Sequence, residues 1–354
     1  MENKKYEGNM NTIKEIAALA KVSPATVSNV LNNRYDQVSS ETREKILGII
    51  RETNFKPNRI AKSLRVNRTH TIGVIAEDIT VFNTPPIING INAFSEQNNY
   101  RIILNDLGLN QKMGHNFSEI TRFKKTIDGS LAVLLSFQVD GIIYVGLHPR
   151  DVTGVLSLAD KPVLYVGCYA KNQMSVTYDD KSAFYKATKT LIDLRHDRIA
   201  LIAGPSDSLA AESRLAGYKE ALEHQDMLYR EELVFTGDWS FESGHKLGKL
   251  LIDSNMLPTA ILAMNDLMAV GAVNAIQDSG LQIPNDISVI GFDNREFCQY
   301  TKPSLTTVQL PLYEMGYMAA NTLIALVDKE DIDHSIKLPC NLIVRDSVGL
   351  HQDY

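Results

Sequence analysis

The sequence predicts an all-α N-terminal domain followed by a larger α/β body. Residues 12–53 contain three short amphipathic segments, each preceded by helix-capping residues. From Thr71 onward, short apolar runs alternate with helical segments, which is typical of parallel sheets covered by helices. The body holds about 280 of the 354 residues, which is enough for two such sheets side by side.

Capping signals mark the helices of the N-terminal domain. Thr12 and Glu15 form a capping box that starts the first helix. After a tight turn, Ser23 can cap a second helix with Pro24 in its first turn, and a third helix begins near Ser39. Two short helices joined by a tight turn and closed by a third helix form a helix-turn-helix.

The exposed face of the second helix favours DNA binding. A plain solvated face is the alternative, but it would carry more Glu, Lys or Gln, because Ser, Thr and Asn are weaker helix formers. A recognition helix enters the major groove with its N-terminal residues at the base edges, where Ser, Thr and Asn can bond bases or phosphates. We therefore expect DNA contacts from Ser23, Pro24, Ala25, Thr26, Ser28, Asn29 and Asn32, and also from Thr12 at the start of the first helix.

The charge distribution agrees with a polyanion contact near the N-terminus. Residues 1–70 hold 13 Lys and Arg against 7 Asp and Glu, whereas the remainder holds 23 against 35. A basic head on an acidic body suggests that one segment meets nucleic acid, and chance clustering of surface charge is the alternative.

Neither secretion nor membrane insertion is expected. No window approaches 18 consecutive apolar residues, and the first eleven residues lack the apolar core of a secretory signal. Three widely spaced cysteines, Cys168, Cys298 and Cys340, suit free thiols in a reducing cytoplasm. The protein is therefore expected to be cytoplasmic, without a membrane partner.

The body shows no pattern typical of an enzyme. The run GIIYVGLH (141–148) has Leu147 and His148 where a phosphate-binding loop needs Lys and Ser or Thr. The run GPSDS (204–208) lacks the second glycine of a nucleophile elbow. The eight histidines show no metal-binding spacing. We expect no catalytic residue, cofactor or metal.

Four residues of the body are candidates for binding a small molecule. Trp239 can stack on a sugar ring, and Asn265 and Asp293 end predicted strands, where α/β sheets bind their ligands. Arg214 begins a predicted helix after a Ser- and Asp-rich loop. The structural alternatives are a surface ion pair for Arg214, a loop anchor for Trp239, and helix capping by Asp266 and Asp293.

Several stretches occur in the order and spacing of one protein family: TIKEIAALAKVSPATVSNVLNN, NFKPNRIAKSL, GPSDSLAAESRLAGY, AMNDLMAVGA and ISVIGFDN. The sequence resembles the LacI/GalR (lac-repressor) family of bacterial transcription regulators over nearly all of its length. The resemblance implies a helix-turn-helix at 10–56, a hinge helix and linker at 57–70, and a periplasmic-binding-protein-like body at 71–354. The body would form two Rossmann-like parallel-sheet subdomains, at about 71–170 with 308–330 and about 171–307 with 331–354. The chain would cross between them near 168–172, 306–311 and 330–336.

The resemblance also implies contacts from the hinge, with Leu64 as an apolar wedge in the minor groove. The hinge residues that would contact DNA are Asn58, Arg59, Ala61 and Leu64. One departure is Asn29, because the family often has there an Arg that reads guanine, whereas Asn suits adenine.

The resemblance places Arg214, Trp239, Asn265 and Asp293 in an effector cleft. Asp78 and Phe82 would face them from the other subdomain. A second departure is Leu310, which stands where the family often has Gln and therefore hints at a different effector.

The predicted function is transcription regulation, with a repressor as the expected type. A homodimer or tetramer would bind pseudo-palindromic double-stranded operator DNA under control of a small molecule, most simply a sugar or sugar derivative. Whether the effector releases or tightens DNA binding stays open. The alternative is a cytosolic solute-binding or sensor protein without a role in DNA regulation.

Overall fold

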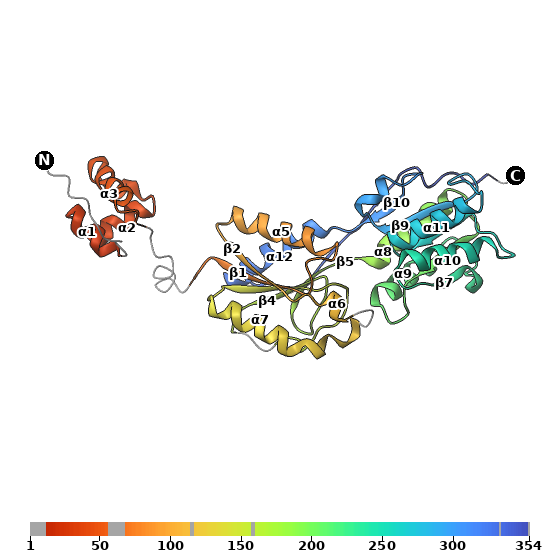
Figure 1. Cartoon of the computed structure of the whole chain (residues 1–354), viewed down its shortest axis with the longest axis horizontal. Coiled ribbons are helices and arrows are strands. Elements are labelled where there is room, and N and C mark those ends of the chain that lie inside the picture. The colour runs from red at the N-terminus through yellow and green to blue at the C-terminus, as the bar shows by residue number, and fades with distance from the viewer. Residues whose placement is uncertain (1–11, 56–67, 114–116, 157–159, 333, 353–354) are drawn as a thin grey trace. The chain divides into compact units, whose positions relative to one another are not determined.

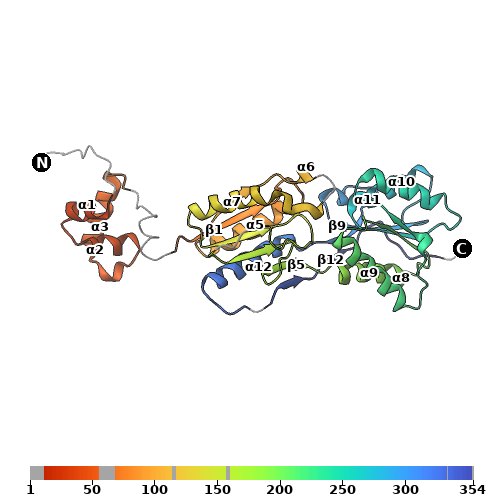
Figure 2. The same ribbon diagram turned by 90° about the horizontal axis from the view of Figure 1, so that it is seen from below.

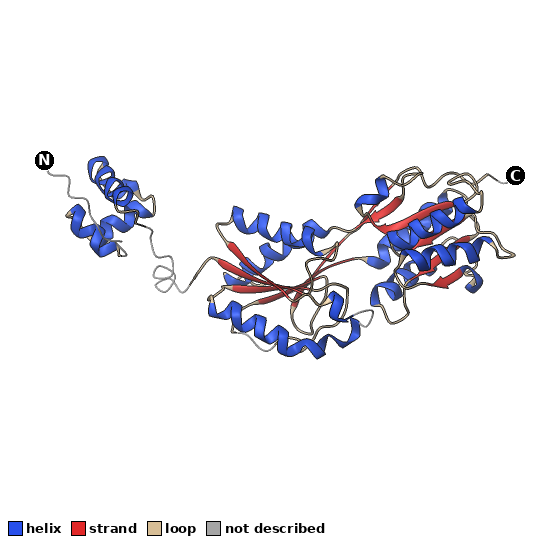
Figure 3. Ribbon diagram, viewed as in Figure 1, coloured by secondary structure: helices blue, strands red, loops and turns tan. Residues whose placement is uncertain are grey.

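The computed structural model describes residues 12–55, 68–113, 117–156, 160–332 and 334–352. The chain divides into two compact units, residues 1–69 and residues 70–354. Within these ranges the first unit is helical, whereas the second combines helices and strands (Figure 3). The predicted fold class is therefore confirmed.

The N-terminal unit has the predicted helix-turn-helix. Its described elements are α1 (Ile13–Ala20), α2 (Pro24–Leu31), the short 3-10 helix η1 (Tyr35–Gln37) and α3 (Ser40–Glu52). The capping box is present, since the Thr12 N–H donates to the Glu15 carboxylate and the Glu15 N–H donates to the Thr12 hydroxyl. These helices bury one small apolar core: Ile16, Ala17, Ala20, Val27, Val30, Ile46 and Phe55.

The body contains two six-stranded sheets. The first is fully parallel and has the order β2 (Arg101–Asp106), β1 (Thr71–Ala76), β3 (Gly141–Val145), β4 (Val163–Val166), β5 (Met174–Tyr178) and β11 (Ile336–Leu338). The second has the order β7 (Val234–Thr236), β6 (Ile199–Ala203), β8 (Ala260–Ala263), β9 (Ser288–Asp293), β10 (Thr306–Gln309) and β12 (Asn341–Ile343). Only β12 in the second sheet runs antiparallel to its neighbour.

Helices cover both sheets (Figures 1 and 2). Around the first sheet lie α5 (Thr84–Gln97), α6 (Asn110–Met113), η2 (Phe117–Phe123), α7 (Lys124–Ser136) and α12 (Leu312–Val327). Around the second lie α8 (Asp180–Asp193), α9 (Leu209–Glu223), η3 (Glu231–Leu233), α10 (Phe241–Ile252), α11 (Asp266–Asp278) and η4 (Glu296–Gln299). None of the helices in the described ranges combines the length and the apolar character needed to cross a bilayer.

Two of the three predicted crossings between the subdomains are wrong. Strand β5 pairs with β4, so the chain leaves the first sheet after Tyr178 and not near 168–172. Strand β11 extends that sheet beside β5, while β12 pairs with β10, so the last crossing lies at 339–340 and not at 330–336. Strands β5 and β11 are short and include polar residues, so they do not stand out as apolar runs in the sequence. The subdomains are therefore about 71–178 with 312–338 and about 179–309 with 341–352.

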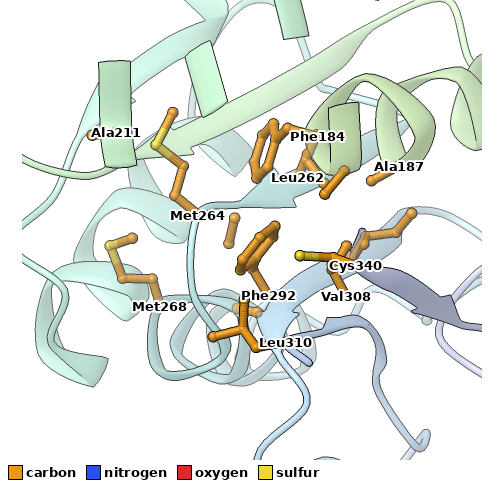
Figure 4. Packing of buried hydrophobic residues seen from close by; sticks show 14 of the residues in the cluster. Phe184, Ala187, Ala211, Leu262, Met264, Met268, Phe292, Val308, Leu310 and Cys340 are labelled. Carbon is orange, nitrogen blue, oxygen red and sulfur yellow. The ribbon is translucent and has the colours of Figure 1, made fainter. Parts of the chain in front are cut away.

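The apolar core of the second subdomain underlies the residues predicted to bind the effector. Phe184 of α8 and Phe292 of β9 face each other with ring centroids 5.8 Å apart (Figure 4). Met264 and Leu310 are buried in the same apolar cluster. Leu310 is therefore a core residue, and this edge offers the cleft no polar side chain at that position.

Candidate recognition helix and effector cleft

Helix α2 presents the predicted polar face. Pro24 and Ala25 are exposed, while Val27 and Val30 are buried against α1 and α3. The Ser23 hydroxyl accepts a hydrogen bond from the Thr26 N–H at 3.1 Å, so Ser23 is the cap of the helix. This geometry leaves the start of α2 accessible, as base readout requires.

The end of the polar face is tied by side-chain hydrogen bonds. Asn32 donates to the Ser28 carbonyl at 2.8 Å, which closes the last turn of α2. Asn29 donates through Nδ2 to Oε1 of Gln37 at 2.9 Å. Sequence reasoning missed Gln37, because it lies eight residues away in η1, outside the helical pattern. The predicted hinge contacts Asn58, Arg59, Ala61 and Leu64 lie outside the described residues.

Four predicted effector residues converge at the carboxyl-terminal edge of the second sheet. Trp239 follows β7, Asp293 ends β9, and Asn265 follows β8 and caps α11. The Asn265 Nδ2 donates to the Trp239 carbonyl at 2.9 Å. The Arg214 guanidinium lies 5.8 Å from the Trp239 ring and 3.7 Å from the Phe292 ring. Parallel strands place their carboxyl ends at one edge, so residues far apart in sequence meet there.

Arg214 makes a buried ion pair rather than a surface one. Its Nε donates to the Asp180 carboxylate at 2.7 Å, and Nη1 donates to the Met264 carbonyl. Burial alone would lower the pKa of Arg214, but the Asp180 carboxylate outweighs it and raises that pKa. Arg214 therefore stays charged at the base of the site.

Asn265, not Asp266, caps helix α11. The Asn265 Oδ1 accepts from the Met268 N–H at 2.9 Å, so both ends of this carboxamide already have partners. Asp266 instead accepts from the Thr307 hydroxyl at 2.5 Å and from the Arg295 N–H at 2.7 Å. The sequence-based capping assignment to Asp266 is wrong, because its carboxylate is drawn toward β10.

Asp293 offers an available acceptor at this edge. Among the described residues, none donates a hydrogen bond to its carboxylate, and its backbone has a φ of 116°. Burial and the neighbouring Asp266 carboxylate raise the pKa of Asp293, while Arg214 and Arg295 oppose that rise. Asp293 is half-buried, and a partly desolvated carboxyl group without a donor favours binding a group that can donate to it.

Asp78 and Phe82, the two predicted effector residues of the first subdomain, differ in how far their side chains are already engaged within the protein. The Asp78 carboxylate accepts from the Thr80 N–H at 2.9 Å and from the Asn110 N–H at 3.0 Å. Burial alone would raise the pKa of Asp78, but these hydrogen bonds lower it overall. Phe82 lies 4.9 Å from the guanidinium of Arg295, so it contacts the second subdomain directly.

A cavity of about 280 Å³ opens between loops of the two subdomains. Its lining comes from residues 148–151 after β3, from residues 205 and 207–209 before and at the start of α9, and from residues 238–239 after β7. Of the six predicted effector residues, only Trp239 lines it. A Cβ on Gly204 would lie 2.1 Å from the Trp239 ring, so glycine there is what lets the ring sit against this loop.

On the first-subdomain side of this cavity, Arg150 forms an ion pair with the buried Glu77 that sequence reasoning missed. Arg150 Nη2 lies 2.5 Å from both oxygens of the buried Glu77, and Glu77 also accepts from the Tyr144 hydroxyl at 2.7 Å. Nε and Nη1 of Arg150 are buried and have no acceptor among the described residues. Burial and the charges of Arg150 and Arg214 lower the pKa of His148 to about 3, so His148 is neutral at pH 7.

Comparison with known proteins identifies the architecture. Residues 12–58 match the model of bacterial regulatory proteins of the lacI family, and residues 188–348 match the periplasmic binding protein-like domain. Catabolite control protein A of Priestia megaterium is 34% identical over 95% of this chain and 98% of its own length. The chain belongs to the LacI family. It is therefore a DNA-binding transcriptional regulator, and the alternative of a sensor without DNA regulation is not supported.

Other relatives extend the comparison. The ribose operon repressor of Haemophilus influenzae is 31% identical over 96% of this chain and 99% of its own length. The lac repressor dimer bound to operator and the anti-inducer ONPF aligns with a TM-score of 0.76 and 28% identity, over 96% of this chain and 99% of that one. The complex of the regulator CelR with cellobiose aligns with a TM-score of 0.64 and 29% identity, over 96% and 100%. These relatives are named as regulators or repressors.

Proposed function

We propose that this LacI-family member is a cytoplasmic, dimeric repressor without catalytic activity, which binds a pseudo-palindromic operator through α2. The exposed polar face of α2 carries this proposal, because its small side chains let the helix approach base edges. The lac repressor relative is bound to operator as a dimer, which supports the same assembly. Residues Thr12, Ser23, Pro24, Ala25, Thr26, Ser28, Asn29 and Asn32, with the hinge residues, would make the contacts.

Binding to random-sequence and selected operator DNA at increasing salt tests this role. Phosphate contacts release counterions, so the affinity should fall steeply and linearly on a double-logarithmic plot against salt. A selected operator should outcompete random DNA by about a thousandfold or more. Equal affinity for both DNAs at every salt concentration would contradict sequence-specific regulation.

We further propose that the cleft binds a polyhydroxylated molecule, most simply a sugar or sugar derivative. Trp239 and Arg150 line the cavity, where Trp239 supplies an apolar ring face and Arg150 supplies donors that have no acceptor among the described residues. Asp293 lies at the same sheet edge as Trp239 and supplies an acceptor to which none of the described residues donates. A sugar hydroxyl can both donate and accept, so one polyol could satisfy both kinds of group. The CelR relative is bound to cellobiose, which agrees with this ligand class.

Calorimetry of the full-length protein against a panel of sugars, sugar phosphates and nucleosides tests the ligand class. Trp239 is the sole tryptophan, so a ligand that covers it should shift the intrinsic emission with the same saturation curve. Trp239→Phe should remove the emission signal and weaken the calorimetric affinity. A sugar that binds without changing the emission, and binds Trp239→Phe equally well, would move the site away from this loop.

A further inference from the structure

The turn between α2 and α3 places a second carboxamide beside the proposed base-reading residue. Asn29 of α2 donates from Nδ2 to Oε1 of Gln37 at 2.9 Å. Gln37 is exposed and Asn29 is half-exposed, so the pair lies at the surface of the N-terminal unit. Neither residue belongs to the apolar core of that unit.

The backbone that carries Gln37 is fixed on both sides. The Arg34 N–H donates to the Asn29 carbonyl at 2.9 Å, which folds the turn back onto the end of α2. The Val38 N–H donates to the Tyr35 carbonyl at 3.1 Å, and Val38 packs against the core. Gln37 therefore reaches Asn29 from an anchored turn rather than from a free loop.

The Tyr35 side chain braces the same turn. Its hydroxyl donates to Asn33 Oδ1 at 2.5 Å. The guanidinium of Arg43, on α3, lies 4.9 Å from the centroid of its ring. A brace on each side of η1 reduces the freedom of Gln37 before any DNA is bound.

The chemistry of the pair leaves Asn29 competent to read a base. A carboxamide nitrogen carries two hydrogens, so Asn29 keeps one N–H and its Oδ1 after donating to Gln37. One N–H donor and one oxygen acceptor are what the bidentate contact with N7 and N6 of adenine needs. Because Gln37 holds Nδ2, the carboxamide cannot rotate freely or exchange its two ends without losing that bond.

We propose that Gln37 is a positioning residue for base readout, which fixes the carboxamide of Asn29 in the orientation that prefers adenine. This inference rests on the proposed operator binding through α2. Gln37 does not itself choose the base; it lowers the cost of ordering Asn29 when the complex forms. The specificity determinant is therefore a pair of residues from two elements, and not one residue of the recognition helix.

Selection from a randomised operator library tests the pair, using the full-length protein and five variants. Asn29→Ala defines the base pair that Asn29 governs. Gln37→Ala should reduce the preference at that same base pair about two- to tenfold, as expected for the loss of one supporting hydrogen bond, and leave other positions unchanged. In the double variant, Gln37→Ala should cause no further loss beyond Asn29→Ala, because both act on one contact.

Two further variants separate positioning from charge and from damage to the turn. Gln37→Glu keeps an acceptor for Asn29, so its base preference should stay within about twofold of the original while affinity falls for all sequences. Asp36→Ala changes the charge of the same turn and should alter affinity without altering any base preference. Circular dichroism confirms that each variant is folded.

The results that would contradict the positioning role of Gln37 can be told apart from the result that would contradict operator binding itself. If Gln37→Ala enriches the same motif as the original protein, or changes a different base pair, the positioning role is wrong although the operator function stands. If Gln37→Glu loses the preference as completely as Gln37→Ala, the hydrogen bond from Asn29 is not what Gln37 contributes. If the original protein enriches no sequence at all, the proposed function fails together with this inference.

Discussion

At the scale of single residues, the body keeps several ionisable side chains away from water. His196 is buried, and its Nε2 lies 3.1 Å from the Gly349 carbonyl while its ring stacks on His351. Burial lowers the pKa of His196 to about 4 from an ordinary value of 6.5. Between these two pH values the unfolded chain binds a proton at this site and the folded chain does not.

The sign of the resulting pH dependence follows from proton linkage. Stability rises with pH wherever the unfolded state binds more protons, so acidification from pH 6.5 to pH 4 should destabilise the body. The contribution of His196 is on the order of 3 kcal/mol. We predict that His196→Gln shows a shallower loss of unfolding free energy than the original protein between pH 7 and pH 5, measured by urea titration. Parallel pH profiles for both proteins would contradict this prediction.

At the scale of elements, α5 and α12 touch through their backbones. A Cβ on Gly90 would lie 2.0 Å from the Tyr313 carbonyl oxygen, and a Cβ on Gly316 would lie 1.9 Å from the Ile87 carbonyl oxygen. Rotation of a side chain cannot relieve these contacts, because the obstructing atoms are carbonyl oxygens of the main chain. Glycine at these positions sets the separation of the two helices.

The glycines allow a matched comparison between two helices of the first subdomain. We predict that Gly90→Ala destabilises the body by about 1–3 kcal/mol or more, because the helices must separate. Gly129, in α7, has open space where its Cβ would stand, so Gly129→Ala should stabilise by about 0.5–1 kcal/mol. Thermal unfolding of both variants measures this contrast. Equal changes of the same sign would mean that α5 and α12 do not pack through these glycines.

The elements also show how far the sequence could predict the fold. The short apolar runs predicted from Thr71 onward correspond to strands β1, β2, β3, β4, β6, β8 and β9, each of which contains a run of apolar residues. Strands β5, β7, β10, β11 and β12 were not predicted, since they have three to five residues and include polar ones. The crossings at 178 and 339–340 depend on those strands, which is why their predicted positions were displaced.

In the candidate site too, some contacts could be predicted from the sequence, whereas a contact between residues far apart in the chain could not. The meeting of Trp239 and Asp293 could be predicted, because strand ends of a parallel sheet share an edge. Arg214 lies in α9, and only the family resemblance predicted its place beside them. The pair of Glu77 and Arg150 could not be predicted, since it joins residues 73 apart through the register of β1 and β3. Nothing local to either residue specifies that partner.

At the scale of the whole molecule, ligand and operator affinities should be coupled and reciprocal. If the effector changes operator affinity by some factor, the operator must change effector affinity by the same factor. The two subdomains contact each other through Phe82 and Arg295, two residues beyond Asp293. A ligand that engages Asp293 therefore binds beside a contact that joins both halves of the body.

We predict that Asp293→Asn separates effector affinity from operator affinity. Loss of this carboxylate acceptor should weaken the effector about 5- to 150-fold, whereas operator affinity without effector should be unchanged, since the helix-turn-helix belongs to a separate unit. At saturating effector the shift in operator affinity should return in full. Asp278→Asn, at an exposed carboxylate paired with His245, is the matched control and should change neither affinity. Unchanged effector binding in Asp293→Asn would exclude this carboxylate from the site, and a changed operator affinity without effector would place Asp293 in the conformational balance of the regulator itself.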